Sequence, residues 1–333
     1  MSKEGKRLKR FETGLIALRR GLEQPSAPYN GSGWRVTLRG LQERPVQGHE
    51  VIIHAASWTT AQRVLDLILA SLYLFKGEPP ILGREYFLIA HNESEPHFDD
   101  PNMRETYIRR SLSTEHIPTA CAIAAKASKK RKWVYAIMKY NFSISLHSQH
   151  FVDLEPFRSP HLGVSSFPID HVTFSYAITA AYSGLEDIGL ELRASRDKPS
   201  RFQGKWNPIV KDDLESRLLK AGINIDDSIL WTVRGPIRKI ERKREIPVLC
   251  KAPWAIGPVR DCEVEVTDAI AYADWLRDWV ASHSVKNLTR ILTPYDVVNV
   301  QHLARRLLLE SLGFWRYLSV QKKRIPTRMS IDK

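Results

Sequence analysis

Cysteine is scarce in this chain: only three occur in 333 residues, Cys121, Cys250 and Cys262, and no two of them form a CxxC pair. An odd number of widely spaced cysteines argues against a disulfide scaffold and against a cysteine-based zinc site, so we expect a reducing compartment. Long apolar runs are also missing, because the longest, Val64 to Phe75, carries Asp66 and is too short to span a bilayer. No apolar segment with a small-residue cleavage site follows the basic N-terminus. We therefore expect a cytoplasmic protein without membrane association.

Familiar enzyme motifs are absent as well. The sequence contains no Walker A motif, no GxGxxG, no HExxH, no GxSxG and no HxE combined with CxxC. Nucleotide hydrolysis, dehydrogenation, zinc proteolysis, serine hydrolysis and zinc deamination therefore lose support, and we expect no cofactor. Two groups are candidate metal sites: the acidic segment around His97, with Asp99 and Asp100, and the pair His147 and His150. Neither has a complete ligand set, so we expect no metal.

Positive charge is what the sequence has in excess. Lys and Arg number 50 against 37 Asp and Glu, a net charge of +13. The excess is clustered in residues 3–20, 126–132, 234–244 and 316–328. Such clusters attract polyanions because each neutralised phosphate releases a condensed counterion. We expect the densest run to be the nucleic-acid-binding element, through Arg234, Arg238, Lys239, Arg242, Lys243 and Arg244. Trp133 lies beside another cluster, where it could stack on bases or belong to the core.

A length of 333 residues predicts two domains, the first of them small and of α+β type. We expect a basic N-terminal helix (residues 6–23) and a linker within residues 1–30, followed by an α+β module over residues 31–150. In that module we expect strands at 34–41, 51–55 and 86–90, and helices from Thr59 or Thr60 to Phe75, at 103–112 and at 119–140. The Pro- and Ser-rich stretch from about Phe151 to Asp170 marks the domain boundary.

The second half of the chain is predicted to be a helical domain over residues 165–315. We expect helices at 171–193 capped by Asp170, at 208–221 opened by Asn207-Pro208 and closed by Gly222, at 268–282 capped by Thr267, and from Thr293-Pro294 to Gly313. Residues 194–263 form a basic insert, in which 223–260 read as turns, and residues 316–333 form a basic tail. The fold class is therefore mainly α, with a helical bundle at the C-terminus and a small α+β module before it.

One pair of residues in this helical half is a candidate catalytic pair. Arg277 lies near the end of the third helix and His283 at its exit, with Asp278 beside the arginine. An arginine can fork onto a phosphate, and a histidine can take the proton of a ribose 2′-OH or protonate the leaving 5′ oxygen. Other arginines precede a histidine at this spacing, and Arg110–His116 is the main rival. Only Arg277–His283 joins an amphipathic helix to a following long helix, so we favour it.

The helical half resembles the HEPN superfamily, whose catalytic members are metal-independent RNases of toxin–antitoxin, abortive-infection and related defence systems. The resemblance covers residues 167–313. It lies in the first helix, Phe174-Ser175-Tyr176-Ala177 through Gly184-Leu185-Glu186-Asp187-Ile188, in Arg277-Asp278 through His283, and in the final helix from Leu303 to Gly313. It implies that Arg277 binds the phosphate, that His283 is the catalytic base or acid, and that Asp278 helps to orient the site. Glu186 could face the same site.

The resemblance also implies a function and partners. We expect an endoribonuclease that cleaves RNA by 2′-OH attack, in antiviral defence or a toxin–antitoxin system. We also expect a homodimer, possible control by an antitoxin or defence-system partner protein, and no role for a metal. The alternative is a catalytically inactive nucleic-acid-binding or scaffold protein with a dimerising helical domain, since many members of the superfamily lack activity.

Overall fold

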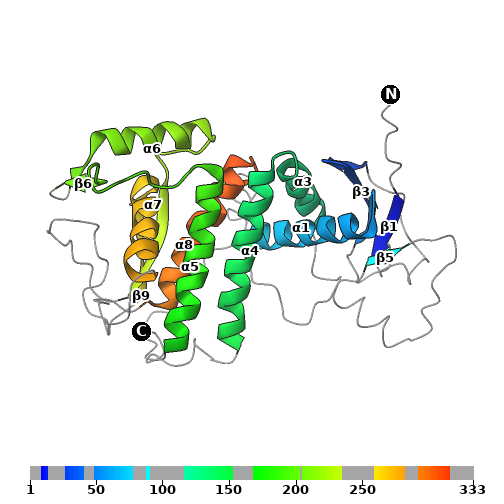
Figure 1. Cartoon of the computed structure of the whole chain (residues 1–333), viewed down its shortest axis with the longest axis horizontal. Helices are drawn as coiled ribbons and strands as arrows, with labels where there is room; N and C mark the ends of the chain where they lie inside the picture. The colour runs from blue at the N-terminus through cyan, green and yellow to red at the C-terminus, as the bar shows by residue number, and fades with distance from the viewer. Residues whose placement is uncertain are drawn as a thin grey trace, which may run out of the picture. The chain divides into compact units, whose positions relative to one another are not determined.

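The computed structural model describes residues 9–13, 27–40, 49–77, 88–90, 116–152, 168–202, 205–234, 259–281 and 292–315. The chain divides into two compact units, Met1–Asn141 and Phe142–Lys333. The division falls inside helix α4 (Arg131–Val152), shortly before the Pro- and Ser-rich stretch in which the sequence predicts the boundary. Helices predominate, and a small antiparallel sheet lies near the N-terminus, so the coarse fold class is confirmed (Figure 1).

An antiparallel sheet forms the centre of the first unit. Its strands are β1 (Lys9–Thr13), β2 (Tyr29–Gly31), β3 (Trp34–Gly40), β4 (His49–Ala55) and β5 (Leu88–Ala90), in the order β2-β3-β4-β1-β5. The predicted strands at 34–41, 51–55 and 86–90 are thus confirmed over their described residues, 34–40, 51–55 and 88–90. Strand β3 buries alternate side chains, Trp34, Val36 and Leu38, because successive residues of a strand point to opposite faces.

Two helices complete the core of this unit. Helix α1 (Trp58–Lys76) packs on β4, and α3 (Ile117–Ala127) packs on α1 and β2. The helix predicted from Thr59 or Thr60 to Phe75 is confirmed, but its cap is Ser57, whose Oγ accepts a hydrogen bond from Thr60 N at 3.2 Å. Gly31 has no room for a side chain, since a Cβ there would lie 1.9 Å from the Trp34 ring.

Two predictions for the first unit are wrong. Residues 9–13 of the expected N-terminal helix form strand β1, which places Phe11 opposite Ile53 of β4 and Ala90 of β5. Pairing with two neighbouring strands outweighs the weak helical periodicity of this segment. The expected helix 119–140 is two helices, because α3 ends at Ala127 and α4 begins at Arg131. The predicted helix 103–112 lies outside the described residues.

The second unit is built around α5 (Pro168–Ile188), which packs against α8 (Pro294–Ser311) and against a π-helical turn, η2 (Leu276–Ala281). Helix α7 (Val266–Trp275) runs directly into η2, and α6 (Pro208–Lys220) packs against α7. A two-residue pair, β6 (Arg201–Phe202) and β7 (Lys205–Trp206), precedes α6. A longer antiparallel pair consists of β8 (Ser228–Arg234) and β9 (Val259–Glu265), and β8 packs on α8.

The predicted helix termini in this half are confirmed at two helices. Asn207 caps α6, because its side chain accepts a hydrogen bond from Ile209 N, and Gly222 follows the helix with a φ of 79°. Thr293 and Asp296 form a capping box at the start of α8, which ends just before Gly313. Reciprocal bonding of this kind satisfies two N–H groups that the first turn of a helix leaves without partners.

Three predictions for this half need correction. Helix α5 already begins at Pro168, so Asp170 lies inside it, and the helix ends at Ile188 rather than 193. Within the expected turns of 223–260, residues 228–234 form a strand that pairs along its whole length with 259–265 and packs on α8. Thr267 is buried inside α7 and does not cap it, and the regular helix ends at Trp275, before 282.

Two side chains of α8 form hydrogen bonds with neighbouring elements. Asn299 accepts a hydrogen bond from Thr232 N and donates one to Thr232 O, both at 2.8 Å, so the amide occupies one edge of β8. Gln301 donates to Ser143 O, and the Ser143 hydroxyl in turn donates to Ala177 O of α5. Among the described residues, none of the helices has the length and apolar character needed to span a membrane.

Candidate functional site

Arg277 stands where regular helix gives way to the π-helical turn η2. Its guanidinium makes ion pairs with Glu186 of α5 at 2.9 Å, with Asp274 at 3.3 Å and with Asp278 at 3.1 Å. The Arg277 Cζ also lies 4.8 Å from the centre of the Tyr182 ring. These contacts hold the arginine on several sides, while 28% of its side chain stays exposed. Isolated π-helical turns are frequent at functional sites.

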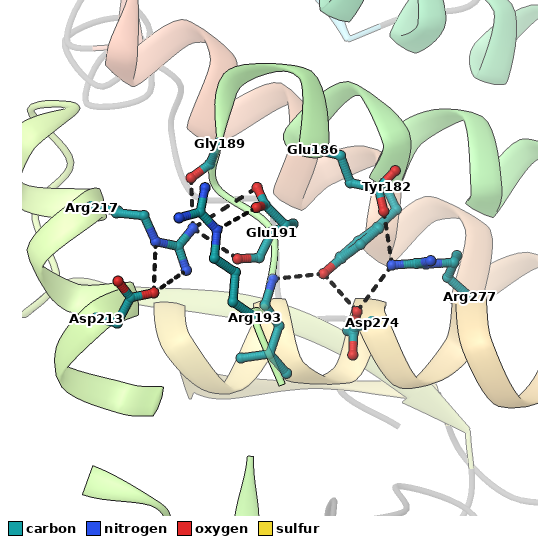
Figure 2. Close-up of polar contacts among 10 residues, drawn as sticks. Tyr182, Glu186, Gly189, Glu191, Arg193, Asp213, Arg217, Asp274 and Arg277 are labelled. Carbon is teal, nitrogen blue, oxygen red and sulfur yellow. Dashed lines mark hydrogen bonds and ion pairs between the residues drawn. The ribbon is translucent and has the colours of Figure 1, made fainter. Parts of the chain in front are cut away.

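Tyr182 and Asp274 form the buried floor of this cluster. The Tyr182 hydroxyl donates to Asp274 Oδ1 at 2.8 Å and accepts a hydrogen bond from Leu192 N at 2.9 Å. The same Asp274 oxygen accepts a hydrogen bond from Arg277 (Figure 2). Tyr182 and Glu186 are four residues apart on α5, and Asp274 and Arg277 are three apart, so each pair lies on one face of its helix.

Burial and neighbouring charge shift the pKa values of these groups. Burial raises the pKa of Asp274 to about 6, against the opposing hydrogen bond from Tyr182 and the opposing charge of Arg277. Burial, together with the Asp274 carboxylate, raises the pKa of Tyr182, so the phenol remains a hydrogen-bond donor. Burial acts to lower the pKa of Arg277, but the carboxylates of Asp278, Glu186 and Asp274 more than offset it. The guanidinium therefore stays charged.

A turn after α5 supplies the backbone amide that bonds Tyr182. Gly189 adopts a φ of 82°, a conformation that disfavours residues with a side chain, and it turns the chain toward Leu192. Arg217 of α6 clamps this turn, donating to the carbonyl oxygens of Gly189 at 2.6 Å and of Glu191 at 2.9 Å. Asp213 holds the Arg217 guanidinium from the other side at 2.9 Å. Figure 2 shows the chain of contacts from Asp213 to Arg277.

The cluster presents one cation that is fixed in place but already surrounded by negative charge. One guanidinium meets three carboxylates, which gives the group a net charge of −2 when all are ionised. Two of the carboxylates are solvent-accessible, with 37% of Glu186 and 48% of Asp278 exposed, whereas Asp274 is 17% exposed. An incoming phosphate would therefore compete with Glu186 and Asp278 for the guanidinium, since Asp274 and Tyr182 hold it from the buried side.

The predicted site residues fall into two groups. Arg277, Asp278 and Glu186 lie together, joined directly by ion pairs. His283 lies outside the described residues, two positions after the end of η2. Arg234 is the last residue of β8, opposite Val259, and its side chain lies outside the described part. The remaining predicted nucleic-acid-binding residues are also outside it: Arg238, Lys239, Arg242, Lys243 and Arg244.

Sequence reasoning missed Tyr182, Asp274 and Arg217. A helical spacing of four places Tyr182 on the same face as Glu186, and a spacing of three places Asp274 beside Arg277. Once Glu186 and Arg277 were candidates, helical spacing could have identified these two neighbours. Arg217 is different. Its partners are backbone carbonyls of a turn that is brought near only by the packing of α6.

Within the described part of the chain, no second centre competes with this cluster. Among the residues that the structure describes, no group of three His, Cys, Asp or Glu side chains could hold a metal ion. The acidic segment around His97 lies outside the described residues. Cys121 is a buried free thiol of α3, and burial raises its pKa, so it is not a reactive thiolate. Trp231 is a core residue that packs against Tyr272, with ring centres 5.5 Å apart, and is not a stacking surface.

Comparison with known proteins adds no identification. No protein-family model, no curated protein sequence and no solved structure matches this chain.

Proposed function

We propose that this protein is a metal-independent endoribonuclease of HEPN type that acts as a homodimer in antiviral defence or a toxin–antitoxin system. The proposal is supported above all by the position of Arg277. Its guanidinium is charged, partly exposed and fixed by Tyr182 and three carboxylates at the exit of α7, six residues before His283. A fixed cation close in sequence to a histidine is the minimum that metal-free RNA cleavage needs.

The reaction is an internal transfer of the phosphodiester. His283 accepts the proton of the ribose 2′-OH as the O2′–P bond forms, and the P–O5′ bond breaks as the protonated His283 gives that proton to the 5′ oxygen. Arg277 offsets the charge that develops on the phosphorane oxygens. Asp278 and Glu186 orient the guanidinium. The attacking hydroxyl belongs to the RNA, so the products are a 2′,3′-cyclic phosphate and a 5′-hydroxyl, and no metal takes part.

A second candidate function is nucleic-acid binding or scaffolding without catalysis. The surroundings of Arg277 favour it, because three carboxylates already pair with the guanidinium and give the cluster a net negative charge. A phosphate would have to displace at least one of these carboxylates. In this function Arg277 is a structural link between α5 and η2, and RNA or DNA binds elsewhere on the basic surface.

Incubating the purified full-length protein with RNA in EDTA separates the two functions. The nuclease proposal predicts 2′,3′-cyclic phosphate or 3′-phosphate ends, and a loss of at least about 100-fold in rate for His283→Ala, the usual contribution of general acid–base catalysis. Arg277→Lys keeps the charge but removes the forked donor, so it should lose a comparable amount. Arg196→Ala, at an exposed position outside the site, is the matched arginine control.

Light scattering and thermal melting show whether each variant is folded and dimeric. If folded, dimeric His283→Ala cuts RNA at the wild-type rate, the assignment of His283 is wrong. If the wild-type protein does not cut RNA but binds it in a salt-sensitive manner that survives both substitutions, the second function is correct.

A further inference from the structure

The segment that forms α3 and α4 contains no carboxylate. Between Glu115 and Asp153 the sequence has no Asp or Glu, although 37 of the 333 residues of the chain are acidic. Five basic residues gather where the two helices meet, and all five side chains are exposed: Lys126, Lys129, Lys130, Arg131 and Lys132. We call these five residues the basic turn. Its position between α3 and α4 can be followed in Figure 1.

The backbone of the basic turn is well fixed. Ser128 N donates to Ala124 O at 2.9 Å, and Lys130 N donates to Ala127 O at 3.1 Å. The Ser128 hydroxyl donates to Ala125 O and accepts a hydrogen bond from Ser32 N, in the connection between β2 and β3. The turn therefore presents its cations from a preformed loop of the first unit, which lowers the entropic cost of binding a partner.

Helix stability does not account for these charges. Lys126 lies in the last turn of α3, where a cation complements the helix dipole. Arg131 and Lys132 lie in the first turn of α4, which has no acidic residue, and there a cation opposes the dipole. The two positive charges at this end are unfavourable for α4 itself, so a role in binding explains them better than a role in folding.

Aromatic side chains stand directly beside the cations. Tyr135 is 46% exposed on the first turns of α4. Arg131 holds it in place: the guanidinium lies 5.1 Å from the ring centre and donates to the Tyr135 hydroxyl at 2.7 Å. Trp133 is half-buried, with Lys132 Nζ 5.9 Å from its ring centre. An exposed ring next to a row of cations is the combination that binds single-stranded nucleic acid, where bases stack and phosphates pair.

We propose that the basic turn is a docking surface for single-stranded RNA, with the five cations on the phosphate backbone and Tyr135 stacked on a base. The inference rests on the proposed function in one respect, because RNA is taken as the polyanion. Single-stranded rather than duplex RNA is favoured, since only an unpaired base offers its face to the Tyr135 ring.

Binding of an uncleavable RNA tests the proposal independently of catalysis. The probe is a fluorescein-labelled 2′-O-methyl RNA oligomer, titrated with the full-length protein at several salt concentrations and followed by anisotropy. The test variant replaces Lys129, Lys130, Arg131 and Lys132 by Ala. The control replaces four exposed basic residues of the second unit by Ala and so removes the same charge: Arg196, Lys198, Lys205 and Lys220.

The test variant should lose at least about tenfold in affinity, and the slope of log K against log salt should fall by about 0.7 for each phosphate that the variant no longer neutralises. The control should lose less than about threefold, because it changes only the overall charge. Tyr135→Ala should weaken binding several-fold without changing the salt slope, whereas Tyr176→Ala, an exposed tyrosine of α5, should not. The melting temperature of the test variant should change little. Loss of the exposed Arg131–Tyr135 hydrogen bond is offset by removal of two cations that oppose the dipole of α4, and Lys129 and Lys130 are exposed.

Equal losses in the two four-residue variants would overturn the proposal, since binding would then follow net charge alone. Tighter binding to double-stranded RNA than to the single strand, or binding only to vesicles of equal parts phosphatidylcholine and phosphatidylserine, would also overturn it. If the test variant loses RNA affinity as expected while the wild-type protein never cleaves RNA, the docking surface stands and only the nuclease function fails.

Discussion

Replacing Asp274 by Asn should change how the free energy of unfolding depends on pH. The change should have the opposite sign to that expected for most paired acids. A carboxylate that is paired in the native state usually has a depressed pKa, and it stabilises the fold at pH values above that pKa. The pKa of Asp274 is instead raised, to about 6 from an ordinary value of 3.8, because burial outweighs its contacts with Tyr182 and Arg277. Between these two values the folded state binds more protons than the unfolded state. Stability contributed by Asp274 is therefore present at low pH and is lost as the pH rises through 6.

The shift sets the size of the effect. A difference of about 2 pKa units corresponds to about 3 kcal/mol at neutral pH, at 1.36 kcal/mol per unit. At about pH 4.5 the Asp274 carboxyl of the unfolded chain is mostly ionised, so part of this stability has already been lost. Through Asp274, the wild-type protein should therefore lose about 2 kcal/mol of unfolding free energy between about pH 4.5 and pH 7.5. The asparagine side chain of the variant does not titrate. Its carbonyl oxygen can still accept the hydrogen bond from the Tyr182 hydroxyl.

Urea unfolding, followed by tryptophan fluorescence at the two pH values, measures this effect. The free energy of unfolding of Asp274→Asn, relative to wild type, should rise by about 2 kcal/mol from about pH 4.5 to pH 7.5. Other titrating groups cancel in this comparison because both proteins contain them. Asp212→Asn, at an exposed position of α6, is the matched control for the loss of one carboxylate. A pH-independent difference for Asp274→Asn would mean that burial does not control this carboxyl, and the account of the buried floor would be refuted.

Two further substitutions test buried hydrogen bonds. Tyr182→Phe removes the hydroxyl that joins Asp274 to the turn after α5, so it should cost about 2 kcal/mol in urea unfolding, the usual cost of leaving buried groups unsatisfied. Tyr176→Phe, at an exposed position, should cost nothing measurable. Asn299→Ala leaves the Thr232 N–H and carbonyl without their side-chain partner, so it should cost about 2 kcal/mol and accelerate hydrogen exchange of the Thr232 amide. An unchanged exchange rate at that amide would show that Asn299 does not protect the edge of β8.

The parts of the fold that the sequence predicted are those encoded locally. The cap at Asn207 and the capping box that begins at Thr293 depend on residues within three positions of one another, and both were readable. Strand β1 could not be predicted from local sequence, because Lys9–Thr13 becomes a strand only by pairing with β4 and β5, which lie far along the chain. Strands β8 and β9 are a similar case, since 24 residues separate them and each pairs with the other, while β8 also packs on α8.

The candidate site shows the same division. The motif around Arg277 was visible as a sequence pattern, and helical spacing brings Asp274 beside it. The contact with Glu186 joins residues 91 positions apart and depends on the packing of α5 against η2. Sequence charge also gave an incomplete description of the environment, because a chain with a net charge of +13 surrounds this particular arginine with carboxylates.

Two charged features in the described part of the chain have opposite surroundings, and under the proposed function this predicts how affinity and turnover should separate. The basic turn lies in a segment without a carboxylate, whereas Arg277 contacts three of them. If RNA is the ligand, as proposed, the first feature attracts it through a net positive charge and the second presents a net negative group. Of these two features, the basic turn should therefore contribute most of the binding energy. Arg277→Lys should therefore lower the rate of cleavage at saturating RNA with little change in affinity. The four-residue variant of the basic turn should weaken affinity and leave that rate nearly unchanged. If both variants lowered affinity and turnover together, the two features would act as one site, and the carboxylates around Arg277 would have to release it when RNA binds.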